Sequence, residues 1–196
     1  EGNYDADERY RAYIDSMAEA GLTVTDEMIE YGDFSEKAEN QINNLLDFNP
    51  DAEAIVCAND MMALTAYDVI AERAALYEKA KKEKDKDGMR RYKRHIIGDT
   101  SEFGIAITGF DNTYDARVFD PSISSVDQNY ELLGIESGKL ICDLLNGVKR
   151  EKELEIPCRF FESESCCSSK AEEINILRRD HCRDSYKLKS EDTLLD

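Results

Sequence analysis

Two polar segments that follow apolar runs carry the side chains best suited to bind a ligand. Asn59 and Asp60 come directly after the apolar run 52–58, and Asp111 follows the apolar run 103–108. In open parallel sheets, ligands bind beyond the carboxyl ends of the strands. An amide both donates and accepts hydrogen bonds, and a carboxylate accepts them from hydroxyls. The pattern therefore predicts a polar site with Asn59 and Asp111 on one edge of a sheet.

Each of these side chains also has a purely structural interpretation. Asp60 stands at the start of a helical pattern, so we expect it to cap that helix by accepting a hydrogen bond from a free N–H group. Asp111 precedes Asn112, and Asp-Asn sequences readily bond the backbone of their own turn. For Asp111 the residues alone leave the turn and the ligand interpretations open.

The elements that must position these side chains alternate between strands and helices. This alternation predicts an α/β fold with a parallel sheet and flanking helices. Asp33 and Glu36 have the spacing of a capping box before the second helix. Pro157 suits an edge strand. The expected helices cover residues 5–20, 38–48, 61–70 and 130–145, and the expected strands cover residues 28–31, 52–58, 103–108, 123–126 and 153–164.

Two charged segments have no place in this alternation. The segment 78–94 is crowded with Lys, Arg, Glu and Asp, and a solvated insertion is expected there. Beyond residue 167 the chain is polar and charged, which predicts a connector or a disordered tail.

Composition limits the classes of function. The net charge of −18 argues against binding of nucleic acid by this segment, because phosphate contacts require clustered Lys and Arg. No apolar run approaches the roughly 20 residues of a membrane span, and the first 20 residues lack a signal-peptide core. We therefore expect no membrane partner and a cytoplasmic protein.

The residues of catalytic and metal sites do not cluster. The six cysteines form no C-x-x-C pair, and the two histidines are isolated in the sequence. This favours reduced thiols over disulfides or zinc. No Ser-His-Asp set, P-loop or glycine-rich nucleotide motif occurs, so we expect neither an enzyme nor a cofactor. A glycosidase that uses Asp60 and Asp111 is a remote alternative, and we expect no hydrolysis of glycosides.

Several separated motifs together resemble one family. Their order matches the lactose- and galactose-repressor family over residues 1–166, and several ordered motifs are more specific than any single one. The motifs are Arg9–Tyr13, Glu30–Phe34, Ala54–Leu64, Ile105–Thr113, Pro121–Gln128, Leu133-Gly134, Leu144–Gly147, and Arg159 with Ser165-Cys166.

The resemblance implies a periplasmic-binding-protein-like sensor of type I, with two α/β subdomains that close on a small effector. Residues 1–120 and 154–166 would form most of the C-terminal subdomain. Residues 123–147 would cross into the N-terminal subdomain, and residues 167–196 would be a tail or connector. The DNA-binding head of the family has no counterpart in this chain.

The resemblance also implies a set of ligand contacts. Asp111 would accept hydrogen bonds from hydroxyls, Arg9 would donate them, and Phe34 would offer a ring face. The alternatives are an ion pair of Arg9 with Asp5 or Glu8, and core packing for Phe34. The full set of expected contacts is Asn3, Asp5, Arg9, Phe34, Asn59, Asp111 and Gln128.

The resemblance implies that the chain is the effector-binding regulatory domain of a transcription regulator. This domain would sense a sugar-like or nucleobase-like molecule. The whole regulator would be a homodimer and would contact DNA only through its head domain. The long connection 72–102 and the tail depart from the family pattern. They keep open a sensor fused to a diguanylate cyclase or histidine kinase. A free solute-binding protein is a third alternative that requires an export signal.

Overall fold

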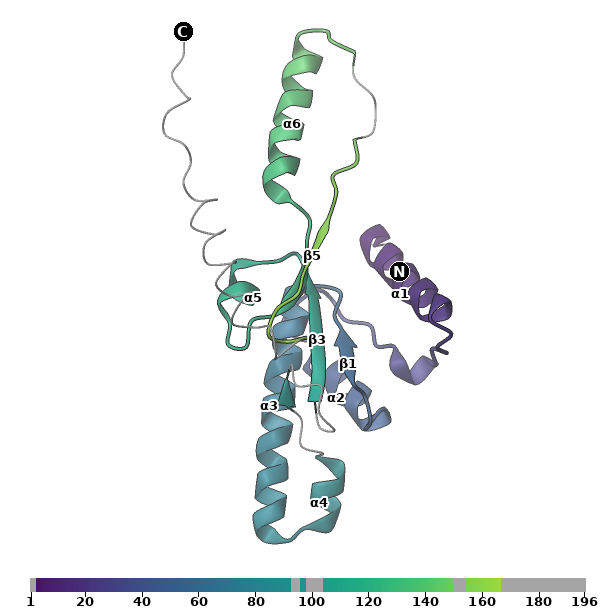
Figure 1. Ribbon diagram of the computed structural model, residues 1–196, viewed down its shortest axis with the longest axis vertical. Helices are drawn as coiled ribbons and strands as arrows, with labels where there is room; N and C mark the ends of the chain where they lie inside the picture. The colour runs from purple at the N-terminus through teal and green to yellow at the C-terminus, as the bar shows by residue number, and fades with distance from the viewer. Residues whose placement is uncertain (1–2, 93–95, 98–103, 150–153, 167–196) are drawn as a thin grey trace.

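A computed structural model describes residues 3–92, 96–97, 104–149 and 154–166. The chain forms a five-stranded sheet flanked by helices (Figure 1), which confirms the predicted α/β class. The helices are α1 (Tyr4–Glu19), η1 (Asp26–Met28), α2 (Glu39–Phe48), α3 (Asp60–Glu83), α4 (Lys86–Arg91), α5 (Tyr114–Val118) and α6 (Tyr130–Leu145). The strands are β1 (Ala54–Val56), β2 (Ile96–Ile97), β3 (Gly104–Phe110), β4 (Ser124–Asp127) and β5 (Arg159–Phe161).

The sheet brings the ends of β1, β3 and β4 to one edge. Strand β3 lies between β1 and β4 and pairs with both in parallel, while β2 also pairs with β3 in parallel. Strand β5 pairs with β4 in the antiparallel sense at the edge, where an edge strand is predicted, but it is shorter than predicted and Pro157 lies before it. The residues that follow β1, β3 and β4 therefore meet at the same edge of the sheet.

One apolar core fastens α2 and α3 to the sheet. Ile105 and Ile107 of β3 are fully buried, and the inward face of α3 packs over them with Ala63, Ala66 and Val69. With the buried Ile70, these side chains recur at the three- and four-residue spacing of an amphipathic helix. The core therefore fixes the start of α3 directly behind the sheet edge.

Two local predictions were wrong. Residues 28–31 form no strand, because η1 ends at Met28 and the following residues are irregular. Asp33 does not cap α2; its Oδ1 accepts hydrogen bonds from the backbone and side chain of Ser35 instead. Short polar side chains often prefer such local turns. Helix α2 starts after Ala38, which makes no side-chain cap bond.

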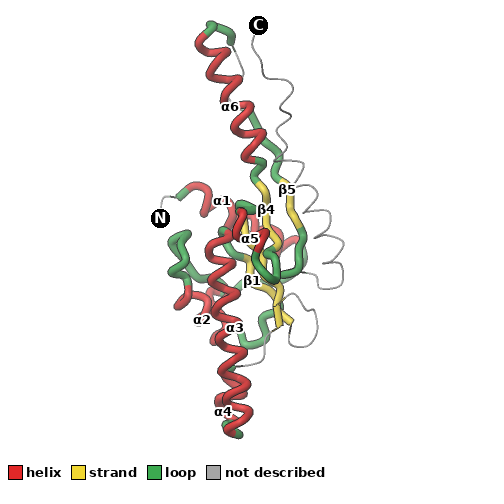
Figure 2. The backbone as a smooth tube through the Cα atoms, turned by 90° about the vertical axis from the view of Figure 1, so that its left-hand side faces the viewer, coloured by secondary structure: helices red, strands yellow, loops and turns green. Residues whose placement is uncertain are grey.

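The charged run expected as a solvated excursion is helical through residue 91. Helix α3 continues to Glu83, and α4 folds back along it. At Gly88 an added Cβ would lie 2.9 Å from the Cβ of Ala80, so the two helices pack closely there. Figure 2 shows this pair at the end of the molecule opposite α6.

Helix α6 forms where predicted, but it carries no buried residue. It projects away from the sheet in Figures 1 and 2. Its exposed apolar side chains are Leu133, Ile135, Ile141, Leu144 and Leu145. Among the described residues, no helix combines the length and the apolar character needed to cross a membrane. The predictions for the tail 167–196 fall outside the described residues.

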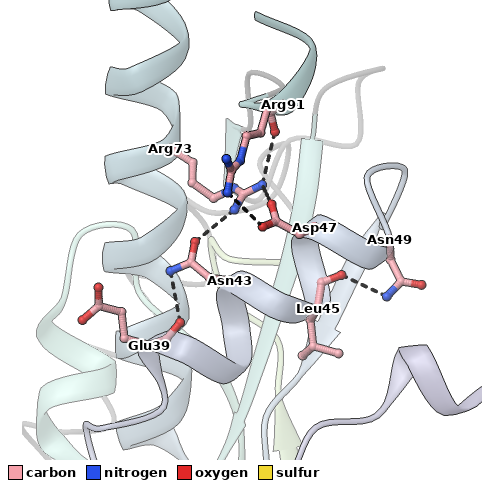
Figure 3. Close-up of polar contacts among 7 residues, drawn as sticks. All are labelled: Glu39, Asn43, Leu45, Asp47, Asn49, Arg73 and Arg91. Carbon is pink, nitrogen blue, oxygen red and sulfur yellow. Dashed lines mark hydrogen bonds and ion pairs between the residues drawn. The ribbon is translucent and has the colours of Figure 1, made fainter. Parts of the chain in front are cut away.

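A buried arginine joins α3 to α2 and α4 (Figure 3). Arg73 is 4% exposed and donates hydrogen bonds to Oδ1 of Asn43 (2.9 Å), Oδ1 of Asp47 (2.7 Å) and the carbonyl oxygen of Arg91 (3.2 Å). A buried guanidinium is costly unless it is paired, and here Nη1 and Nη2 are bonded while Nε has no partner among the described residues. Arg73 therefore acts as the polar junction of the three helices.

We expect Arg73→Ala to lower the free energy of unfolding by about 2 kcal/mol, because it removes bonds to a charged group whose acceptors stay partly buried. Urea denaturation of the full-length protein measures this loss. Arg90→Ala is the control, since Arg90 lies at the surface and pairs with the exposed Asp87; its effect should stay within about 0.5 kcal/mol. Equal effects of the two substitutions would contradict the role assigned to Arg73.

The cysteines differ in accessibility. Cys57 is buried directly after β1, while Cys142 and Cys158 are exposed free thiols. Burial, aided by the negative charge of Asp60, raises the pKa of Cys57 to about 12. Of these three cysteines only Cys57 lies in the core, because α6 and the segment before β5 are uncovered among the described residues.

We expect Cys57 to resist alkylation by iodoacetamide at pH 8, because a raised pKa leaves almost no thiolate and the side chain is inaccessible. Mass spectrometry of peptides measures the rate at each cysteine. Full alkylation of Cys57 in guanidinium chloride is the control. Labelling of native Cys57 as fast as Cys158 would show that β1 opens in solution.

Candidate functional site

Asp111 lies at the centre of a small hydrogen-bonded cluster at the carboxyl edge of the sheet. Its Oδ1 accepts hydrogen bonds from Nε2 of Gln128 (2.5 Å) and from Oη of Tyr130 (3.1 Å). Nε2 of Gln128 also donates to Oη of Tyr130 at 2.9 Å. The structure thus brings together Asp111 and Gln128, two of the predicted residues, and adds Tyr130. The side chain of Asp111 reaches these neighbours from a turn.

Tyr130 is a site residue that the sequence analysis missed. It is the first residue of α6, and nothing in the sequence distinguishes it from the other nine tyrosines except its place two residues after Gln128. Burial raises the pKa of Tyr130, the negative charge of Asp111 and its hydrogen bond raise it further, and the positive charge of Arg9 opposes them. The phenol of Tyr130 therefore belongs to the same polar cluster as the Asp111 carboxylate, to which it donates its hydrogen bond.

Arg9 reaches the same edge from α1. Its Nη1 donates to the carbonyl oxygen of Ala58 at 2.7 Å, and the guanidinium carbon lies 3.8 Å from the ring centroid of Phe110 and 5.8 Å from that of Phe34. The expected alternative, an ion pair with a neighbour on α1, does not form in the described part of the chain: Glu8 pairs with Arg11. A guanidinium stacked on an aromatic face is held in orientation while its other donors stay available.

Phe34 is held in an unusual backbone conformation near Arg9. Its φ is +63°, which is rare for a bulky residue. The carbonyl of Phe34 accepts a hydrogen bond from Nδ2 of Asn59 at 2.9 Å. Of the five described non-glycine residues with positive φ, four lie at this edge: Phe34, Asp111, Asn112 and Asn129. Such strain concentrates at ligand sites.

Asn59, and not Asp60, caps helix α3. Helix α3 begins at Asp60, so Asn59 is its N-cap, and Oδ1 of Asn59 accepts from the N–H of Met62 at 3.0 Å. The prediction that Asp60 caps the helix is wrong, because the helix starts one residue earlier than expected. Asn59 is 7% exposed and both ends of its amide are bonded. Its ligand contact stays a prediction.

Asp60 lies inside the protein, beneath the edge. It is fully buried, and it accepts hydrogen bonds from Oγ of Ser125 (2.6 Å) and from the N–H (2.6 Å) and Oγ1 (3.0 Å) of Thr113. Burial raises the pKa of Asp60, and these hydrogen bonds oppose the rise. The carboxylate is therefore an internal anchor, and it is not a surface acid that could pair with Asp111 in catalysis.

The other two predicted contacts lie at the start of α1. Oδ1 of Asn3 caps this helix by accepting from the N–H of Ala6 at 3.2 Å, and Asp5 is exposed in the first turn. Neither is hydrogen-bonded to Asp111 or Gln128 in the described part of the chain. Their ligand contacts stay predictions that the cluster around Asp111 does not include.

The arrangement combines one carboxylate acceptor, amide and guanidinium donors, and aromatic ring faces. These groups suit a small neutral ligand with several hydroxyl or amide groups. Among the described residues, no group of three or more His, Cys, Asp or Glu side chains could hold a metal ion.

Comparison with known proteins places this chain in a family. The family described as "Periplasmic binding proteins and sugar binding domain of LacI family" matches residues 3–164. The transcriptional regulator CelR of Thermobifida fusca is 28% identical over 145 residues, which are 74% of this chain and 36% of that protein. The repressor PurR of Actinobacillus pleuropneumoniae serotype 3 (strain JL03) is 28% identical over 146 residues, which are 74% of this chain and 35% of that protein.

Solved structures are similar over most of this chain. A complex of transcriptional regulator CelR with cellobiose has a TM-score of 0.61 at 25% identity, over 81% of this chain and 42% of that one. The Escherichia coli repressor ascG has a TM-score of 0.63 at 20% identity, over 84% of this chain and 52% of that one, and shows the same fold.

The chain spans about a third of the length of the curated relatives, 36% of CelR and 35% of PurR. Since the family match covers residues 3–164, this chain belongs to the family of periplasmic binding proteins and LacI-type sugar-binding domains.

Proposed function

We propose that this chain is the effector-binding regulatory domain of a LacI-family transcription regulator, and that it senses a sugar-like or nucleobase-like molecule by lobe closure. The observation that carries the proposal is the cluster of Asp111, Gln128 and Tyr130 at the carboxyl edge of the sheet, with Arg9 stacked on the adjoining Phe110. The cellobiose complex of the CelR relative supports a hydroxyl-rich ligand.

The cluster leaves binding capacity for such a ligand. Oδ1 of Asp111 is occupied by Gln128 and Tyr130, and Oδ2 has no hydrogen-bond partner among the described residues. Oδ2 would accept from a ligand hydroxyl, and the free donors of Arg9 would bind a ligand oxygen. The ring of Phe34 would cover one face of the ligand.

A second lobe would complete the cleft. We propose that residues 1–120 and 154–166 belong to the C-terminal subdomain and that residues 123–147 cross into an N-terminal subdomain. The rest of the N-terminal subdomain would cover the exposed apolar side of α6. The exposed leucines and isoleucines of α6 support this division, because such a surface is normally buried against protein. Ligand would bind the closed arrangement more tightly than the open one and so shift the population between them.

The complete protein would act in the cytoplasm as a homodimer that binds DNA through a separate head domain. One structural neighbour is described as a Lac repressor dimer bound to operator, which supports this assembly. Catalysis forms no part of the proposal. The receptor alternative gains no support, because the named relatives are transcription regulators.

We expect at least one member of a panel of cellobiose, galactose, adenosine and guanosine to raise the melting temperature of the full-length protein. A ligand at one hundred times its Kd adds about 2.7 kcal/mol of stability. Asp111→Ala should abolish this shift, because it removes the hydroxyl acceptor. Differential scanning fluorimetry measures both effects.

Asp115→Ala is the matched control, since Asp115 is an exposed carboxylate on α5 and should leave the shift unchanged. A shift that survives Asp111→Ala would place the ligand elsewhere. Failure of every compound to stabilise the wild-type protein would contradict the ligand classes proposed.

A further inference from the structure

We propose that Asp60 is a positioning residue of the ligand site: it holds the turn that carries Asp111 and thereby sets the direction of the Asp111 carboxylate. This inference rests on the proposed function, because it concerns the same site. It gives a role to a fully buried acidic residue that helix capping does not explain, since Asn59 caps α3.

The surroundings of Asp60 show that the carboxylate has a specific structural task. A buried carboxylate is costly unless its oxygens accept several hydrogen bonds. Both oxygens of Asp60 do so: Oδ1 accepts from Oγ of Ser125 at 2.6 Å, and Oδ2 accepts from the N–H of Thr113 at 2.6 Å and its Oγ1 at 3.0 Å. These bonds connect the start of α3 to β4 and to the turn after β3.

Three consecutive backbone N–H groups of that turn are held in place. The N–H of Asp111 donates to the carbonyl oxygen of Val126 at 2.8 Å, and the N–H of Asn112 donates to Oγ of Ser125 at 3.0 Å. The third N–H belongs to Thr113 and donates directly to Asp60. Ser125 gives its own hydrogen to Asp60, which turns the lone pairs of its Oγ toward Asn112. Two of the three anchors therefore depend on Asp60.

The turn needs these anchors because its backbone is strained. The φ angles are +107° at Asp111 and +51° at Asn112, in a region that residues with a Cβ seldom adopt. Such a conformation persists only where its surroundings over-determine it. Without the anchors, the turn would relax to negative φ, and the carboxylate of Asp111 would leave Gln128 and Tyr130.

Strand β3 has a glycine where the buried Asp60 packs against it. Gly109 precedes the turn, and a Cβ added to it would lie 3.1 Å from the Cα of Asp60. That contact is tighter than ordinary packing and involves backbone, which cannot move aside cheaply. The close approach of Gly109 keeps Asp60 directly beneath the turn, without an intervening side chain.

Two variants of the full-length protein test the inference. Asp60→Asn keeps the shape of the side chain but replaces one acceptor oxygen with a donor nitrogen. Ser125→Ala is milder and leaves the charge of Asp60 in place, so it keeps the test valid if Asp60→Asn does not fold. Arg73→Ala is the control, because it destabilises the same lobe through the α2–α3–α4 junction, away from the turn.

The first readout is affinity, measured by calorimetry with each of cellobiose, galactose, adenosine and guanosine that binds the wild type. Both turn variants should weaken binding about tenfold or more, the range typical of residues that orient a ligating side chain. Arg73→Ala should leave the Kd unchanged. Unchanged affinity in both turn variants would overturn the inference.

The second readout needs no ligand. The Asp111 carboxylate helps to raise the pKa of Tyr130, so displacement of that carboxylate should lower this pKa toward the ordinary tyrosine value. Tyrosine labelled with ¹³C at Cζ reports the titration by NMR, with Tyr130→Phe to assign the signal. Ser125→Ala should lower the pKa of Tyr130, and Arg73→Ala should not.

The outcomes of the two readouts can be told apart. If the pKa of Tyr130 is the same in Ser125→Ala as in the wild type, the inference is overturned even if no compound in the panel binds. Absence of binding by the wild type would count against the proposed function alone.

Discussion

The arrangement of the candidate site depends on one buried carboxylate. Asp60 joins α3, β4 and the turn after β3, and three hydrogen bonds satisfy it where no water reaches. A buried charge of this kind is stable in only one geometry, since any displacement leaves an acceptor unpaired. The edge of the sheet is therefore tied to the core that packs α3 against β3.

The same edge would link the proposed ligand binding to α6, the part of the chain that projects from the sheet. Gln128 lies between β4 and α6, Tyr130 is the first residue of α6, and both side chains donate hydrogen bonds to Asp111. A ligand that engages Asp111 would change the balance of these contacts at the base of α6. Differential contacts in two arrangements are what an allosteric transition requires. The proposed lobe closure thus has a definite starting point in the structure.

Much of the fold could be predicted because strong periodicity and clear end signals agreed. The helix ended by Gly21, the strand before Asn59 and the long apolar helix after Gln128 all formed as expected. The predictions failed where the same short stretch of residues was compatible with more than one local structure. Asp33 accepted hydrogen bonds from its neighbour Ser35 instead of capping a helix. The charged run 78–91 formed the end of α3 and the helix α4, where Gly88 packs against Ala80 and the carbonyl of Arg91 accepts from Arg73, and the charge pattern does not predict these contacts.

The sequence alone determined which strands would deliver polar side chains to one edge, because buried runs followed by Asn and Asp specify where a strand stops. It also carried the family motifs. Only the tertiary structure decided what each polar group does there. Whether Asn59 or Asp60 caps α3 depends on a shift of one residue in the helix start, and the meeting of Tyr130 with Asp111 depends on the pairing of β3 with β4. Hydrogen bonds between residues distant in sequence depend on the packing of the whole lobe, and the residue pattern of a single segment does not predict them.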